Sequence, residues 1–187
     1  ASAMLSSTNA TTASSRCSIL VGRGSTWRYL DDGSDQGTAW RATSFDDSGW
    51  ASGAAHLGYG DADEATELSY GPDENAKYTT TYFRRSFQVT DPNAFADLRI
   101  RLLRDDGAMV YLNDTLLVRA NMPVGAITSS TFAASTVSGS SEDLFFTFAA
   151  APTALAAGTN VLAVEIHQRT LTSSDISFDM ELIGLDG

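Results

Sequence analysis

The chain has 187 residues, the size of one ordinary domain, and its 43% hydrophobic content is enough to build a packed core without disulfides. Its single cysteine, Cys17, excludes an internal disulfide bond. The 23 acidic residues outnumber the 12 basic ones. The resulting net charge of −11 weighs against nucleic acid, anionic membranes and strongly anionic polysaccharides as partners, and it favours cations. No apolar run approaches the ~20 residues that a membrane-spanning helix needs.

The first 15 residues differ in composition from the rest of the chain. They consist of Ala, Ser, Thr and Asn with one Met and one Leu, which is typical of flexible linkers. We therefore expect residues 1–15 to be a flexible linker or a remnant of protein production. Residues 16–187 are expected to form a single β-sandwich domain.

Patterns typical of β-strands dominate the chain from residue 82 onward. In the segment 176–182, Ile176, Phe178 and Met180 alternate with polar residues, as expected of a strand with one buried face. The other predicted strands cover residues 82–89, 98–102, 108–112, 116–120, 144–148 and 161–168. Short strands separated by turns, without a long amphipathic helix, predict an all-β antiparallel sandwich.

Two turn signals lie between these strands. Asp105-Asp106-Gly107 and Asn113-Asp114 are residue types that tolerate the backbone angles of tight turns. We expect these turns to connect the strands 98–102, 108–112 and 116–120 into one β-meander.

The segment 58–77 is irregular and strongly acidic. It holds six acids and two tyrosines, and a loop of this length inside a compact domain is usually functional or disordered. Asp61, Asp63 and Glu64 lie close together in it, and calcium prefers about six to eight oxygen ligands such as carboxylates. Their spacing does not complete an EF-hand, so a solvated mobile loop is the alternative to a calcium site.

Asp105 and Asp106 form a second candidate calcium site. Paired aspartates before a glycine resemble the turn in adhesin-type sugar-binding β-domains, in which adjacent aspartates hold calcium and touch the sugar. The alternative is a tight turn in which the aspartates accept hydrogen bonds from backbone N–H groups. Asp31, Asp32 and Asp35 form a similar cluster that is open to the same two interpretations.

Four motifs occur in an order that is found in a known family. They are Phe45-Asp46-Asp47-Ser48-x-Trp50, Tyr82-Phe83-Arg84, Asp105-Asp106-Gly107-x-x-Val110-Tyr111-Leu112-Asn113 and Gly158-x-Asn160-Val161-Leu162-Ala163-Val164-Glu165. This order resembles the galactose-binding-like jelly-roll domains of bacterial secreted hydrolases, and it is similar to the sugar-binding domain of β-galactosidase-type glycosidases. The resemblance implies a jelly-roll sandwich with one structural calcium, an accessory rather than catalytic role, and a secreted or cell-surface location. Many relatives have Asn-Gly at the hairpin where this chain has Asn113-Asp114.

Three tyrosines in or beside the acidic segment are candidates for carbohydrate binding. Sugars stack their apolar C–H faces on aromatic rings, and Tyr59, Tyr70 and Tyr78 stand near carboxylates that can bond hydroxyl groups. Packing within the loop is the alternative for each tyrosine. The acidic balance favours a neutral glycan over an anionic one, and the three tryptophans are expected in the core.

A hydrolytic site is the least favoured hypothesis. His167 precedes Ser173-Ser174-Asp175, but no G-x-S-x-G elbow accompanies this arrangement. We instead expect His167 to brace a strand end by bonding a nearby aspartate. The sequence therefore predicts no catalytic residues, and a carbohydrate-binding accessory module of an exported multidomain bacterial protein with calcium as a structural ion. The alternative is a structural domain that packs against a neighbouring enzyme module without binding sugar.

Overall fold

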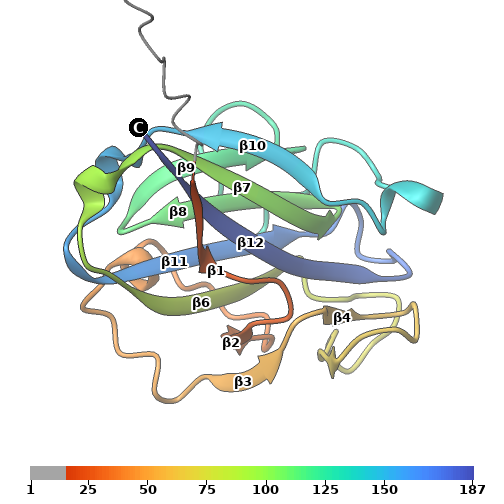
Figure 1. The fold of residues 1–187 in the computed structure, drawn as a ribbon. Helices are drawn as coiled ribbons and strands as arrows, with labels where there is room; N and C mark the ends of the chain where they lie inside the picture. The colour runs from red at the N-terminus through yellow and green to blue at the C-terminus, as the bar shows by residue number, and fades with distance from the viewer. Residues whose placement is uncertain (1–15) are drawn as a thin grey trace, which may run out of the picture.

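Two β-sheets lie face to face in the computed structural model, which describes residues 16–187 (Figure 1). Residues 1–15, the expected linker, lie outside the described residues. The first sheet contains, in spatial order, β10 (Phe146–Ala150), β7 (Phe95–Asp105), β12 (Ile176–Asp186), β4 (Leu57–Tyr59) and β5 (Thr66–Glu67), and β1 (Cys17–Val21) pairs with β12. The second sheet contains, in spatial order, β3 (Ala51–Ala54), β2 (Thr26–Leu30), β6 (Thr80–Val89), β11 (Gly158–His167), β8 (Gly107–Leu112) and β9 (Thr115–Ala120). The predicted all-β sandwich is confirmed, with β4–β5 as the one parallel pair among the described strands.

Helix in the described part of the chain is confined to short 3-10 turns. These are η1 (Ala39–Arg41), η2 (Pro92–Ala94), η3 (Gly139–Ser141) and η4 (Pro152–Ala154). Proline begins η2 and η4, where its fixed φ angle suits the first position of a helical turn. None of the helical segments between residues 16 and 187 has the length and apolar character to cross a membrane.

The core lies between the sheets and is built from alternating strand residues, as predicted. On β12, Ile176 and Met180 are buried, and Phe178 is completely inaccessible to solvent. The Phe178 ring contacts Trp27 of β2 edge-to-face, with 5.0 Å between ring centroids, and it contacts Phe83 of β6 at 4.2 Å. These aromatic contacts join the C-terminal strand to two strands of the opposite sheet.

The strands predicted from residue 82 onward are present, with shifted ends. The segment predicted at 144–148 is β10, which begins and ends two residues later. The five strands before residue 80 were not predicted. They are short or largely exposed: β1 has one buried residue among five and β3 has none, so their sequences carry little apolar alternation.

One predicted connection is wrong. The hairpin between β8 and β9 is present, with Asn113 and Asp114 at φ 50° and 70°, as its tight turn requires. However, β7 pairs with β10 and β12 in the first sheet, whereas β8 pairs with β9 and β11 in the second. The residues 105–107 therefore carry the chain from one sheet to the other and do not continue a meander. Aspartate and glycine suit a hairpin and such a corner equally, so only pairing with distant strands distinguishes the two.

Loops cover the outer face of the second sheet. A second hydrophobic cluster forms there, in which side chains from 31–50 and 121–137 pack on β6, β8 and β11. The rings of Trp40 and Trp50 stack with 6.4 Å between centroids, and Trp40 contacts Tyr82 at 4.9 Å. The segment 31–50 therefore has a structural role, because it covers this face of the sheet. All three tryptophans are buried, as expected.

Arg84 of β6 fixes this cover to the sheet. Its side chain is 2% exposed, and its Nε donates to Oδ2 of Asp47 at 2.8 Å. Its other nitrogens donate to the backbone carbonyls of Trp40, Ala42 and Phe45. Because a guanidinium group presents several N–H donors in a fixed plane, one side chain holds four acceptors of the same loop.

Replacing Arg84 by alanine is expected to lower the free energy of unfolding by about 3 kcal/mol, because a partly buried carboxylate and the backbone carbonyls lose their donor. Arg99→Ala, at an exposed position of β7, removes the same charge and should change stability by less than about 0.5 kcal/mol. Urea unfolding followed by tryptophan fluorescence measures both variants. Equal effects would contradict the role assigned to Arg84.

Candidate cation site at one end of the sandwich

The corner between β7 and β8 places Asp105 and Asp106 at one end of the sandwich. Asp105 is the last residue of β7 and lies opposite Ser177 of β12, which in turn lies opposite Gly58 of β4. Both aspartates are buried, with 1% and 2% of their surface exposed. Because these three residues are neighbours across the sheet, the corner lies beside the loop that precedes β12 and the loop that follows β4.

Asp106 accepts two backbone hydrogen bonds that hold neighbouring loops. Its Oδ1 accepts from the N–H of Val137 and its Oδ2 accepts from the N–H of Arg169, each at 2.7 Å. Bonds from N–H groups to an ionised carboxylate are stronger than bonds between neutral groups. Asp106 therefore ties the segment after β9 to the segment after β11, and both of its carboxylate oxygens are engaged.

Asp105 lacks such partners. No donor contacts its Oδ1 within the described residues, although this atom is buried. The Asp175 carboxyl group lies within hydrogen-bonding reach of the Asp105 carboxyl group. Burial, together with the neighbouring carboxyl groups of Asp106 and Asp175, raises the pKa of Asp105 to about 9. The adjacent Arg104 donates to the backbone carbonyl of Asp106 and forms no ion pair with Asp105.

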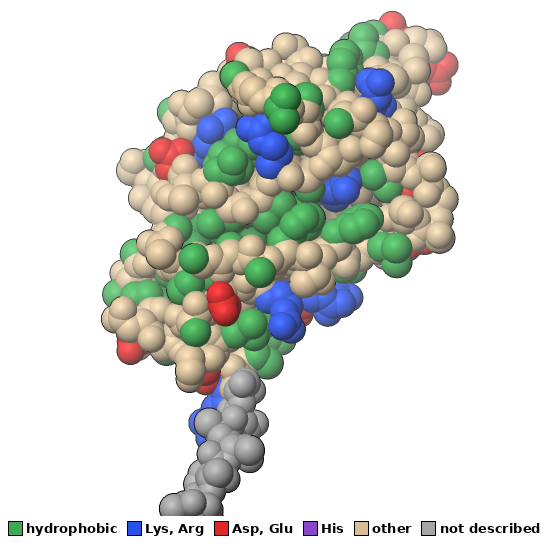
Figure 2. Space-filling view, turned by 90° about the horizontal axis from the view of Figure 1, so that it is seen from above, with side chains coloured by type: hydrophobic (Ala, Val, Ile, Leu, Met, Phe, Trp, Pro, Cys, Tyr) green, Lys and Arg blue, Asp and Glu red, His purple; other side chains and the backbone are tan. Residues whose placement is uncertain are grey.

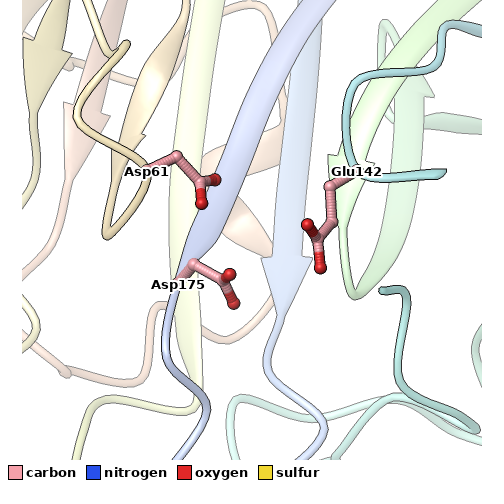
Figure 3. Close-up of side chains that lie close together, drawn as sticks. All are labelled: Asp61, Glu142 and Asp175. Atoms are coloured by element: carbon pink, nitrogen blue, oxygen red, sulfur yellow. The ribbon is translucent and has the colours of Figure 1, made fainter. Parts of the chain in front are cut away.

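Asp175 also belongs to a group of three carboxylates from separate segments of the chain. Asp61 follows β4, Glu142 follows η3, and Asp175 precedes β12. One carboxylate oxygen of each lies within 4.8 Å of the other two, and Figure 3 shows the three side chains around a common space. Burial raises the pKa of Asp61 and of Glu142, and the Asp175 carboxylate is the next cause for both. In residues 16–187 no basic side chain forms an ion pair with these three acids.

Gly60 allows the loop after β4 to approach Asp175. Its φ angle is +112°, in the region that favours glycine. A Cβ atom at this position would lie 2.8 Å from Cβ of Asp175 and 2.9 Å from the carbonyl oxygen of Ser174. A larger residue would therefore displace Asp61 from its position beside Asp175.

The predicted ligands Asp61, Asp63 and Glu64 do lie together, with one oxygen of each within 4.8 Å of the others. Two of them have other partners. Asp63 faces Nδ1 of His56 at 3.4 Å, and Glu64 accepts a hydrogen bond from the N–H of Asp61 at 3.0 Å. Of these three acids, Asp61 alone also belongs to the group around Asp175.

Sequence reasoning missed two residues of the site. Glu142 is far from the acidic segment in the chain, and the sequence associates Asp175 only with His167. The position of Asp175 directly before a strongly alternating strand was the one available signal, because strand ends often carry functional side chains.

The aspartates at 31, 32 and 35 all accept hydrogen bonds from backbone N–H groups. Asp32 and Asp35 each accept a hydrogen bond at 2.9 Å from the backbone N–H two residues further along the chain. Asp31 accepts one from the N–H of Ser69 at 2.6 Å. The contacts of Asp32 and Asp35 correspond to the interpretation of this cluster as tight turns, whereas Asp31 connects two distant segments.

The three candidate tyrosines differ in exposure. Tyr59 is 5% exposed, and its hydroxyl group accepts a hydrogen bond from Gln168. Tyr70 is 37% exposed and contacts Tyr59 edge-to-face at 5.2 Å, and the ammonium group of Lys77 lies 5.2 Å from each ring. Tyr78 is half-buried. Of the three, Tyr70 and Tyr78 are therefore the ones with accessible surface.

Tyr78 lines a pocket of about 230 Å³ together with Gly33, Ser34, Lys77, Thr79, Thr80, Ser129 and Ser130. The pocket thus combines an aromatic side chain with several hydroxyl groups. This composition matches the mixture of apolar and polar groups that small-molecule sites use.

His167 does not have the partner that the sequence suggested. Its Nδ1 lies 2.9 Å from Oγ1 of Thr80 and 2.8 Å from the carbonyl oxygen of Thr131. Because a carbonyl only accepts, Nδ1 carries a proton and donates to Thr131. Its Nε2 lies 3.5 Å from Oε2 of Glu165. Within the described residues neither ring nitrogen bonds Asp175 or a serine hydroxyl group.

No protein-family model matches the chain, and no curated protein matches it. Solved structures share its fold. The chain is similar to β-glucuronidase 2 of Bacteroides uniformis covalently bound to cyclophellitol-6-carboxylate aziridine, at 17% identity and a TM-score of 0.58 over 91% of this chain and 18% of that one. A calcium-binding mutant of the same enzyme matches at 15% identity and a TM-score of 0.57 over 91% and 18%. A glycoside hydrolase family 2 member from Bacteroides cellulosilyticus matches at 12% identity and a TM-score of 0.55 over 91% and 20%.

The chain therefore spans about a fifth of the length of the enzymes that it matches. Similarity at these identities establishes the fold. Four sequence motifs indicated a resemblance to the sandwich domain of β-galactosidase-type glycosidases. The fold that this resemblance implies is confirmed.

Proposed function

We propose that this chain is a non-catalytic accessory domain of an exported multidomain bacterial protein related to glycosidases, and that it binds carbohydrate. The observation that carries the proposal is the extent of the match. The match extends over 91% of this chain but only 18% of a β-glucuronidase, as expected of one sandwich domain from a larger enzyme. The acidic surface favours solubility outside the cell.

Calcium is the structural ion that we propose for this domain. Carboxylate oxygens are the ligands that calcium prefers, and Asp61 can supply them together with Asp63 and Glu64 or together with Glu142 and Asp175. The calcium-binding mutant of the B. uniformis enzyme supports calcium as an ion of a related protein.

The pocket at Tyr78 is the proposed carbohydrate site. A half-buried aromatic ring can stack on the apolar face of a sugar, while the hydroxyl groups of Ser34 and Ser130 can exchange hydrogen bonds with sugar hydroxyls. Tyr70 offers a second exposed ring. The net charge of −11 favours a neutral glycan over an anionic one.

Filling this pocket should abolish glycan binding without unfolding the domain. Ser130→Trp adds a large side chain at an exposed position of the pocket rim, and we expect roughly a tenfold or greater loss of affinity for any glycan that a glycan array identifies. Ser44→Trp, at an exposed position that does not line the pocket, is the matched control. Equal affinities of the two variants, or an array without any bound glycan, would contradict the proposed site.

An interaction domain that binds no sugar is the second candidate. Figure 2 shows hydrophobic side chains gathered in a band across the face of the molecule that is seen from above. Exposed apolar residues in the described chain include Val124, Leu144 and Leu116, at 97%, 52% and 43% exposed. An apolar band of this kind can mark a contact with another protein surface. Protection of these residues in a complex with a neighbouring module, without glycan binding, would favour this candidate.

His167→Ala is expected to leave any hydrolytic activity of a preparation unchanged, because we assign no catalysis to this domain. The variant should instead lower the free energy of unfolding by about 1–3 kcal/mol, since the partly buried Thr131 carbonyl loses its donor. Thermal unfolding and a panel of chromogenic glycosides and esters measure the two effects. Loss of a hydrolytic activity in this variant would overturn the non-catalytic assignment.

A further inference from the structure

Three arginines line one pocket of about 360 Å³ at the place where the pairing of β2 with β6 ends. Arg28 and Arg84 are the last paired residues and lie directly opposite each other. Beyond them, Arg85 donates to the backbone carbonyl of Thr26. Like charges directly opposite one another on two strands repel, because their Cβ atoms are only about 5 Å apart. The pocket therefore concentrates positive charge on a chain whose net charge is −11.

Within residues 16–187, only one of these three charges has an acidic partner. The guanidinium group of Arg84 is paired with Asp47 at 2.8 Å, and Asp47 is the one carboxylate in the pocket lining. Arg28 donates to the backbone carbonyl of Trp50 at 3.2 Å. In the described part of the chain, neither Arg28 nor Arg85 forms an ion pair. Two positive charges at this pocket are thus left without a counter-charge.

Arg85 distinguishes the pocket from an ordinary basic surface. Exposed arginines are solvated and need no partner, but Arg85 is half-buried, and its Nε atom is buried without an acceptor among the described residues. Burial lowers the pKa of Arg85, because the charged group loses hydration. A bound anion would offset the free-energy cost of holding this cation in the protein.

Hydroxyl groups complete the lining of the pocket. Ser52 of β3 lies opposite Arg28. Thr26 and Ser86 each lie two positions along the strand from an arginine of the pocket, and therefore on the same face of the sheet as that arginine. Hydroxyl groups donate hydrogen bonds to the same oxyanions that guanidinium groups bind. The lining thus offers both cationic and neutral donors.

We infer that this pocket binds a tetrahedral dianion: sulfate, phosphate or the phosphate group of a small ester. Guanidinium groups present N–H donors in a planar fork that matches such groups, and a dianion balances both free charges, whereas a carboxylate balances only one. The net charge of the whole chain disfavours long anionic polymers, but a small dianion can enter a pocket whose own charge is positive. The inference depends on neither the proposed carbohydrate site nor the proposed calcium ion.

Calorimetric titration of the full chain with sodium sulfate, and with sodium phosphate at about pH 8, tests the site. We expect one binding event for each tetrahedral anion and at least tenfold weaker binding of acetate. Arg28→Gln, at an exposed position, and Arg85→Gln should each weaken sulfate binding by roughly tenfold or more, because a charge-assisted contact is lost. Arg99→Gln removes the same charge from an exposed position of the other sheet and should leave the affinity unchanged.

Three results would overturn the site. They are no binding of sulfate or phosphate by the wild type, acetate binding as tight as sulfate binding, and equal weakening by Arg28→Gln and Arg99→Gln, which indicates diffuse charge attraction. Circular dichroism checks the fold of each variant. Because Arg28 is exposed, Arg28→Gln keeps the comparison valid even where Arg85→Gln does not fold.

Glucose 6-phosphate and glucose distinguish the sources of the bound group. Equal affinities for inorganic phosphate and glucose 6-phosphate would support a site for the free ion, and tighter binding of the ester would support a site for a phosphorylated solute. An ester that binds no more tightly than glucose would overturn the site. Binding of either anion in the presence of a calcium chelator separates this result from the calcium proposal.

Discussion

The two hydrogen bonds that Asp106 accepts from Val137 and Arg169 fix the end of the sandwich where the chain changes sheets. Because both bonded groups belong to loops, this one buried carboxylate sets the course of the segments that follow β9 and β11. At the same corner, Asp105 is buried at the end of β7, and its carboxyl group lies near that of Asp175. The arrangement of acids is thus a consequence of how the two sheets are connected.

The fold and the acidic corner are separate properties of the chain. The two-sheet fold is shared with a domain-sized part of family 2 glycosidases at 12–17% identity, and at that distance it establishes no ligand. Side chains in loops at one end of the sandwich form the corner, and such loops are where accessory domains of one fold acquire different binding properties. The pocket at Tyr78 is a second loop-built feature, so the proposed sugar and cation sites can be tested independently.

Sequence reasoning succeeded where local alternation is strong. Ile176, Phe178 and Met180 predicted a strand with one buried face, and the structure places all three in the core. It failed at the Asp105–Gly107 turn, because identical residues can close a hairpin or cross between sheets. Glu142 and Asp61 approach each other only through the fold, and no spacing rule connects acids so distant in sequence. The acidic segment itself was recognised, but two of its acids have partners that only the structure identifies.

The most direct test of the account is a high-resolution crystal structure of the protein grown in calcium. The account predicts one ion at the corner, with oxygen atoms of Asp61 and of the carboxylates beside it at about 2.3–2.6 Å and anomalous scattering that identifies calcium. The contrary result is a corner without an ion, in which the Asp105 and Asp175 carboxyl groups share a proton across about 2.5–2.7 Å. That geometry would make the buried pair a neutral structural contact and would contradict the cation site.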